Sequence, residues 1–217
     1  MTVKNTVVTA VVRQFGRPRG LVGRLAGWQM AHRPSNRRRN AWVVSVLDPR
    51  PGDRVLEVGF GPGLAVAEMS DRVGPTGHVY GIDHSEVMHR QATQRCASAV
   101  RDGRVTLVHG SVDALPATLD GPFDAVVSVN SFAFWADSAR RLEDLRRRLV
   151  PGGRIAIASQ ARHPGVTRNP ERAGREISQL LEDAGFTRPR VESLDLDPPV
   201  VCVLAAADGT DDGGQRA

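Results

Sequence analysis

The chain has few of the residue patterns that mark secreted, membrane or metal-binding proteins. Its 217 residues include only two cysteines, Cys96 and Cys202. A distant pair provides neither a disulfide framework nor metal-ligand spacing, so we interpret both as small buried apolar residues. No apolar run approaches the ~20 residues of a membrane-spanning helix, and the run at residues 7–12 is too short for a signal-peptide core. We therefore expect a cytoplasmic protein with no membrane span and no bound metal.

Acidic residues are absent from residues 1–47, which contain nine basic ones. The other 170 residues carry 20 basic and 24 acidic side chains, so this segment accounts for the net charge of +5. Apolar residues from Leu21 to Trp28 recur at helical spacing. Residues 1–40 are thus predicted to form a basic helical arm. It is either a lid over a neighbouring ligand site, with Trp28 in the wall, or a solvated tail that contacts nucleic acid non-specifically.

Beyond residue 40 no internal repeat is found, and strand and helix patterns alternate, which predicts a doubly wound α/β domain over residues 41–207. A short helix at 41–47 precedes this alternation. Parallel strands are expected at 54–58, 78–82, 104–108, 123–129 and 153–158. Helices are expected at 64–72, 85–100, 137–149 and 171–184. Two more strand-like runs, 190–195 and 200–206, predict a terminal antiparallel hairpin that completes a seven-stranded sheet. The Gly- and Asp-rich tail, 208–217, is expected to be disordered.

The most informative segment is a glycine-rich turn after the first predicted strand, with glycines at 59, 61 and 63. Glycine allows positive φ angles and close approach to a ligand, and the N-terminus of the following helix points at the same place. The dinucleotide pattern G-x-G-x-x-G/A is missing, because its last position falls on Leu64 or Val66. The segment therefore predicts a nucleotide-type cofactor site that is not a typical NAD site.

An acid two residues before G-x-G-x-G, Glu57, resembles motif I of the class I S-adenosylmethionine (SAM)-dependent methyltransferases. Asp83 after the second apolar run and the Pro-Gly-Gly turn at 151–153 extend the resemblance over about residues 41–207. The resemblance implies a Rossmann-like sheet with a terminal hairpin. It also implies SAM as the cofactor and S-adenosylhomocysteine as the product.

The resemblance also implies roles for residues at the first two strand ends. Glu57 would hold the amino-acid end of SAM, and Asp83 would accept hydrogen bonds from both ribose hydroxyls. His84 would lie beside the ribose, without acting as a base. Met88 would either pack on the adenine or belong to the core. The cofactor would lie against the backbone of the turn residues Gly59, Phe60, Gly61 and Gly63.

After the third strand, the family often has an acid that binds the adenine amino group. This chain has Ser111 at that position and an acid two residues later, Asp113. Either Ser111 replaces the acid or Asp113 reaches back. The resemblance places the backbone N–H of Val112 against the adenine ring in both cases.

After the fourth strand, Asn130 and Ser131 are expected to face the cofactor, because ligands bind at the carboxyl ends of parallel strands. The aromatic residues that follow would shape the acceptor pocket and contact the sulfonium. Two of them could instead pack under the next helix, Phe132 and Trp135. The aromatic candidates for substrate binding are Phe132, Phe134 and Trp135. Past the fifth strand, His163 is the candidate general base and acceptor contact, or else a solvent-exposed loop residue.

The predicted function is transfer of the SAM methyl group to a small-molecule acceptor by in-line displacement. Positioning alone can supply on the order of 7–11 kcal/mol of the acceleration, so a base motif is not required. One alternative is methylation of RNA or another polyanion through the basic arm. Asn130-Ser-Phe-Ala stands where many base-methylating enzymes have Asn-Pro-Pro-Tyr, which argues against it. The other alternative is a non-catalytic nucleotide-binding protein. The acceptor atom and the oligomeric state are left open.

Overall fold

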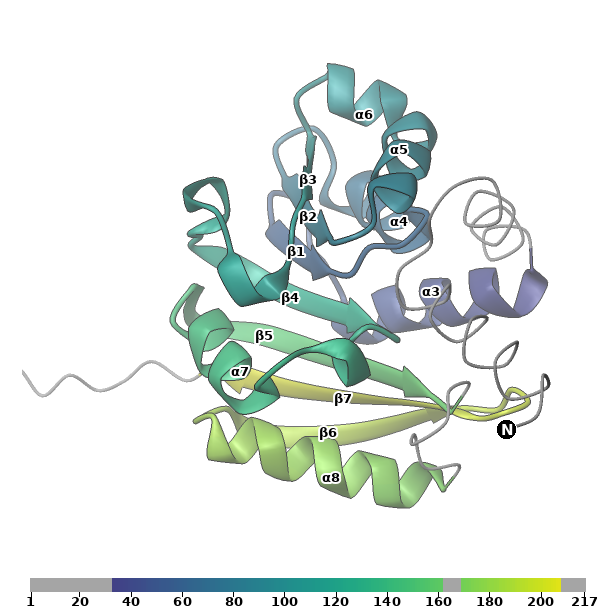
Figure 1. The fold of residues 1–217 in the computed structure, drawn as a ribbon, viewed down its shortest axis with the longest axis vertical. Coiled ribbons are helices and arrows are strands. Elements are labelled where there is room, and N and C mark those ends of the chain that lie inside the picture. The colour runs from purple at the N-terminus through teal and green to yellow at the C-terminus, as the bar shows by residue number, and fades with distance from the viewer. Residues whose placement is uncertain (1–32, 162–168, 208–217) are drawn as a thin grey trace, which may run out of the picture.

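The computed structural model describes residues 33–161 and 169–207. Its centre is a seven-stranded sheet with the strand order β3-β2-β1-β4-β5-β7-β6. Neighbouring strands from β3 to β5 run parallel, whereas β7 runs antiparallel to both β5 and β6 (Figure 1). The strands are β1 (Arg54–Val58), β2 (His78–Asp83), β3 (Val105–His109), β4 (Phe123–Val129), β5 (Leu149–Gln160), β6 (Thr187–Leu194) and β7 (Val200–Ala207). The predicted seven-stranded sheet with a terminal antiparallel hairpin is confirmed.

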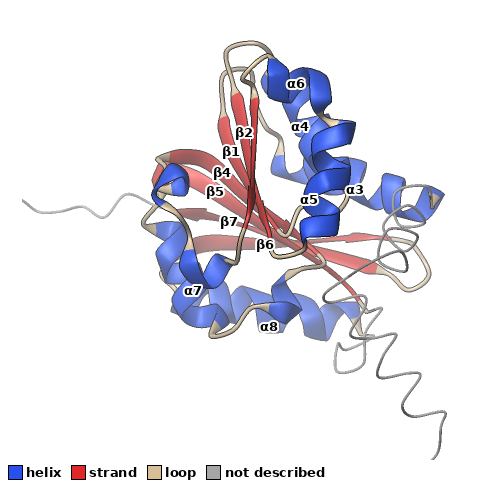
Figure 2. Cartoon of the chain, turned by 45° about the horizontal axis from the view of Figure 1, so that its top comes forward, coloured by secondary structure: helices blue, strands red, loops and turns tan. Residues whose placement is uncertain are grey.

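Helices cover both faces of the sheet (Figure 2). They are α3 (Pro34–Leu47), α4 (Leu64–Val73), α5 (Glu86–Arg95), α6 (Ala97–Arg101), α7 (Ser138–Arg146) and α8 (Pro170–Asp183). Buried residues of α3, α4, α5 and α6 share one apolar cluster, and those of α7 and α8 share the other. The predicted doubly wound arrangement is therefore confirmed.

The two clusters are separated by the sheet because successive side chains of a strand point to opposite faces. On β1, Val55 belongs to the cluster of α3 and α4, whereas Leu56 belongs to that of α7 and α8. On β5, Ala156 belongs to the cluster of α3 and α4, and Ile155 belongs to that of α7 and α8. Central strands buried on both sides explain why these runs are almost wholly apolar in the sequence.

Helix α3 begins earlier than the sequence pattern predicted. It starts at Pro34, a residue whose fixed φ suits the first turn of a helix, and ends at Leu47, followed by the C-cap residue Asp48 with a left-handed φ of 52°. Residues 34–40, assigned from the sequence to the basic arm, are thus the first half of a helix that packs on the sheet. The helical stretch predicted at 85–100 is also divided, into α5 and α6, at Cys96.

Several predictions concern residues outside the described ranges. These are the helical arm before residue 33, with Trp28, the loop that contains His163, and the tail at 208–217. Their placement stays a prediction. Among the helices that the structure describes, none is long and apolar enough to span a membrane.

Candidate functional site

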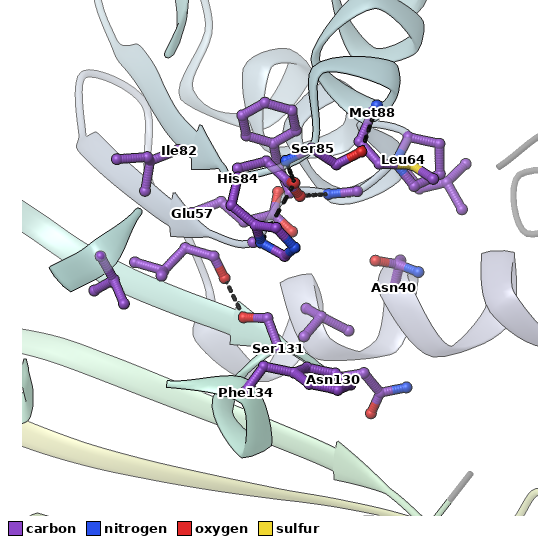
Figure 3. A pocket seen from close by; sticks show the side chains of 18 of the residues that line it. Asn40, Glu57, Leu64, Ile82, His84, Ser85, Met88, Asn130, Ser131 and Phe134 are labelled. Carbon is purple, nitrogen blue, oxygen red and sulfur yellow. Dashed lines mark hydrogen bonds and ion pairs between the residues drawn. The ribbon is translucent and has the colours of Figure 1, made fainter. Parts of the chain in front are cut away.

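A cavity of about 450 Å³ opens at the carboxyl ends of the parallel strands. Its walls come from the turns that follow β1, β2, β3 and β4, from α3, and from the loop between β6 and β7. In an open α/β sheet this edge is where ligands bind, at the point where the strand order reverses. That point lies between β1 and β4 here. Figure 3 shows side chains from these elements converging on the cavity.

The glycine-rich turn after β1 forms the floor of the cavity. Gly59, Gly61 and Gly63 have φ angles of 80°, 52° and 79°, in the region that favours glycine. A Cβ at Gly59 would lie 2.2 Å from the Cβ of Ser131, whereas one at Gly61 would have no atom within 4 Å. Gly59 thus allows two loops to pack closely, and Gly61 presents bare backbone to open space in the cavity.

Glu57 is a buried carboxylate in the cavity wall, with 1% of its surface exposed. It accepts a hydrogen bond from the backbone N–H of Val66, in the first turn of α4. Its other oxygen, Oε2, has no hydrogen-bond partner among the residues that the structure describes. Burial, and next the nearby carboxylate of Asp83, hold the pKa of Glu57 well above its ordinary value. A ligand with an ammonium group would satisfy this oxygen, which fits the amino-acid end of SAM.

Asp83 ends β2 and is held by two backbone donors. Its Oδ2 accepts from the N–H of Gly61 and its Oδ1 from the N–H of Ser85, both at 2.8 Å. Each oxygen retains a lone pair for a further donor, which suits the two hydroxyls of a ribose. Burial raises the pKa of Asp83, and the two N–H groups oppose that rise. The carboxylate therefore connects the turns after β1 and β2 and faces the cavity.

The residues after Asp83 complete the same part of the wall. Ser85 caps α5 by accepting from the N–H of Met88 at 3.4 Å. Met88 is buried and lines the cavity, and so does His84. The Nδ1 atom of His84 lies 4.0 Å from Oδ1 of Asp83. The structure thus brings His84 and Met88, predicted for the ribose and adenine side, to the same cavity as Asp83.

The loop after β3 distinguishes the two alternatives for the adenine contact. Ser111 and Val112 line the cavity, whereas Asp113 does not. The Asp113 carboxylate accepts a hydrogen bond from Oγ of Ser111 at 2.8 Å and lies 4.0 Å from the guanidinium of Arg141. This geometry favours Ser111 over Asp113, because the acid is directed toward α7.

The loop after β4 contributes Asn130, Ser131, Phe134 and Trp135 to the wall. Oγ of Ser131 donates to the carbonyl of Val58, which joins this loop to β1. Phe134 is 44% exposed and lies across the cavity from Ser85 and Met88 (Figure 3).

Phe132 differs from the other two aromatic candidates, because it does not line the cavity. Its ring packs edge-on against Trp135, with a centroid separation of 5.0 Å, and against the core. The packing role considered from the sequence therefore describes Phe132. Trp135 contacts both the core and the cavity.

Sequence reasoning missed four polar residues of α3 and its N-cap that line the cavity. They are Arg33, Asn36, Arg39 and Asn40. Nη1 of Arg39 donates to Oδ1 of Asn36 at 3.0 Å and to Oε1 of Gln160 at 2.9 Å. A signal was present in the sequence, because residues 36, 40, 43 and 47 share one helix face. Apolar residues at 43 and 47 predict that the polar ones at 36 and 40 are buried as well.

Comparison with known proteins agrees with this geometry. The profile of the methyltransferase domain family matches residues 55–153. The chain is 33% identical over 190 residues to the uncharacterized methyltransferase YdaC of Bacillus subtilis (strain 168), an alignment that covers 86% of this chain and 99% of that protein. It is also 33% identical over 157 residues to nocamycin O-methyltransferase of Saccharothrix syringae, over 70% of this chain and 55% of that one.

The fold has solved counterparts as well. The crystal structure of a SAM-dependent methyltransferase from Aquifex aeolicus superposes with a TM-score of 0.66 at 24% identity, over 82% of this chain and 96% of that one. At this identity the superposition shows the fold alone. Taken together with the match to YdaC over nearly its whole length, it shows that the chain belongs to the class I SAM-dependent methyltransferases.

Proposed function

We propose that the protein transfers the methyl group of SAM to a small-molecule acceptor that binds in the same cavity. The observation that carries this proposal is the division of the cavity wall into two parts. The predicted cofactor contacts lie at the ends of β1, β2 and β3, from Glu57 to Val112, and at the end of β4, with Asn130 and Ser131. A second part, formed by α3, Phe134 and Trp135, remains for another ligand. The name of nocamycin O-methyltransferase is consistent with a small acceptor in a related enzyme.

In this proposal, the residues of the site act mainly by holding two ligands in a reactive arrangement. When bound, SAM supplies a methyl group on a sulfonium, which is an excellent leaving group. Glu57 and Asp83 would orient the cofactor, and the bare backbone at Gly61 allows its close approach. Phe134 and Trp135 would hold the acceptor and exclude water. Such positioning can supply on the order of 7–11 kcal/mol of the acceleration.

A general base is not required by this arrangement. His84 is the one histidine that lines the cavity within the described ranges, and it lies beside Asp83 on the cofactor side. His163 stays the predicted base, in the loop outside those ranges. An acceptor whose reactive atom is already deprotonated, or carries a lone pair, would need no base.

Calorimetry followed by a transfer assay tests the proposal. S-adenosylhomocysteine should bind with a micromolar Kd, roughly −8 kcal/mol, and NAD should not bind. The transfer assay should detect methylation of compounds from a small-molecule collection and none of total RNA. The variant Asp113→Ala serves as a control, because Asp113 does not line the cavity. Methylation of RNA without any small-molecule turnover would favour the polyanion alternative.

A further inference from the structure

We propose that the second part of the cavity selects planar acceptors that carry an anionic oxygen group, with Arg39 and Arg33 receiving that group. This proposal rests on the proposed function, because it assigns the acceptor to the part of the wall that lies outside the predicted cofactor contacts. Arg39 is the specificity-determining residue, and Arg33 assists it from the cavity mouth.

The first observation is the separation of charge along the cavity wall. The acidic residues in the described wall are Glu57 and Asp83, at the ends of β1 and β2. The arginines of the wall, Arg33 and Arg39, belong to α3 and its N-cap. Arg39 bonds to Gln160 at the end of β5, which is two strands away from β1. At about 4.8 Å between strands, these strand ends lie roughly 10 Å apart. The cavity therefore has an acidic end for a cationic cofactor and a basic end beyond it.

The second observation is that the guanidinium of Arg39 is held in one orientation. Only 6% of the residue is exposed, and Nη1 donates to amide oxygens of Asn36 and Gln160. Gln160 is itself fixed, because its Nε2 donates to the carbonyl of Pro198 at 2.6 Å and its backbone N–H to Oδ1 of Asn130 at 2.7 Å. A planar guanidinium that is already oriented matches a carboxylate and loses little entropy on binding it.

Arg33 adds a second positive charge in a different environment. It is the N-cap residue of α3, it is exposed, and it lines the cavity. Its guanidinium forms no ion pair with any residue in the described ranges. An exposed cation in the cavity wall can attract an anionic acceptor before Arg39 binds it.

The third observation concerns the shape of the acceptor. Phe134 provides flat apolar surface on the side of the cavity opposite Met88 and Leu64 (Figure 3), and its neighbour in the chain, Trp135, also lines the cavity. Aromatic side chains favour flat partners, by stacking or edge-on contact. A ligand that satisfies both the arginines and these rings has a planar body with an anionic oxygen group at one end.

Binding of matched acids and amides tests this inference. The probes are 4-hydroxybenzoate with 4-hydroxybenzamide, and 1-hydroxy-2-naphthoate with 1-hydroxy-2-naphthamide, each titrated by NMR into the protein saturated with S-adenosylhomocysteine. We expect each acid to bind about ten-fold or more tightly than its amide, because the guanidinium forms an ion pair with the acid and only a hydrogen bond to the uncharged amide. The preference for the acid over the amide should disappear in Arg39→Gln. In Arg33→Gln it should fall about three-fold, because this substitution removes an exposed charge without affecting the core.

Arg38→Gln is the matched control, because Arg38 is an exposed arginine of α3 that does not line the cavity. It should retain the full preference. Two results would overturn the inference and leave the proposed function standing. In the first, acids and amides bind equally well. In the second, neither binds although S-adenosylhomocysteine still does. A second contrary result would be weaker binding of S-adenosylhomocysteine, with unchanged binding of 5′-methylthioadenosine, in Arg39→Gln. The guanidinium would then serve the cofactor carboxylate. Failure of the wild-type protein to bind S-adenosylhomocysteine would count against the proposed function itself.

Discussion

Gly59 and Gly61 lie two residues apart in one turn, yet they are needed for different reasons. The space beside Gly59 is occupied by Ser131, so this position is determined by packing between the loops after β1 and β4. The space beside Gly61 is empty, and its N–H is bonded to Asp83. Packing and ligand binding can therefore be separated by the same substitution at two positions.

Gly59→Ala should lower the free energy of unfolding by about 2–4 kcal/mol, because a clash adds to the strain of a positive φ. Gly61→Ala should cost only about 1–2 kcal/mol of stability, but should weaken binding of S-adenosylhomocysteine at least ~10-fold, a loss of about 1.4 kcal/mol. Urea denaturation and calorimetry measure the two effects. Similar stability losses in both variants would contradict the assignment.

Asp83→Ala should weaken binding of S-adenosylhomocysteine by ~1.5–3 kcal/mol, since a charged acceptor for two hydroxyls is lost. Asp83→Asn should have a smaller effect, because its amide oxygen still accepts. Calorimetry on both variants and on Asp113→Ala makes the comparison. If Asp113→Ala were as damaging as Asp83→Ala, the orientation of the Asp113 side chain toward α7 would be wrong for the bound state.

Glu57 links stability to pH. Because burial raises its pKa in the folded protein above the ordinary 4.5, the folded state holds this proton more tightly than the unfolded state does. Its contribution is thus fully present below pH 4.5 and declines as the pH rises through the raised pKa. Glu57→Gln should remove this decline and gain stability relative to wild type as the pH rises above 4.5. It should also bind S-adenosylhomocysteine more weakly, since the carboxylate is lost. Parallel pH profiles from denaturation of the two proteins would contradict this prediction.

At the scale of elements, helix α3 joins the cofactor domain to the basic arm. Its second half buries Val43, Val44 and Leu47 in the cluster shared with α4. Its first half places Asn36 and Arg39 in the cavity wall. One continuous helix therefore both packs in the core and lines the cavity.

Truncation separates α3 from the residues before it. Deletion of residues 1–40 should abolish methyl transfer, because it removes the first half of α3 from the cavity wall. The loss of cofactor affinity should be modest, since the glycine-rich turn remains. Deletion of residues 1–32 leaves α3 intact, and on the lid hypothesis it should still lower turnover, by admitting water to the site. Full small-molecule turnover after the shorter deletion would favour the basic tail.

At the scale of the whole molecule, the helices on one face of the sheet take no part in lining the described cavity. Helices α7 and α8 pack on the face opposite α3, and no residue of either helix lines the described cavity. Mutations in these helices should therefore change stability with little effect on binding.

Leu181→Ala in α8 tests this separation. Leu181 is fully buried, so truncation to Ala should cost about 2–5 kcal/mol of stability through lost burial and a cavity. The Kd for S-adenosylhomocysteine should stay within about two-fold of wild type when measured well below the melting temperature. Calorimetry beside urea denaturation measures both quantities. A large change in Kd would show that the two faces are coupled through the sheet.

The sequence alone determined the order of strands and helices, the glycine-rich turn, and the placement of Glu57 and Asp83 at strand ends. These features depend on local periodicity and on backbone conformations available within a few residues. The terminal hairpin followed in the same way, from two strand-like runs with a short connection. The start of α3 was placed too late because its first half is polar and lacks the apolar spacing of a core helix.

Tertiary structure decided which polar and aromatic side chains meet at the cavity. Arg39 and Gln160 are 121 positions apart in sequence, and they meet only because α3 packs on one face of the sheet, in contact with β5. The same long-range packing places Phe134 in the cavity wall, sets the partly buried Phe132 against the core, and directs Asp113 toward Arg141. Side-chain direction in such loops depends on neighbours from distant segments, and no local pattern in the sequence records that information.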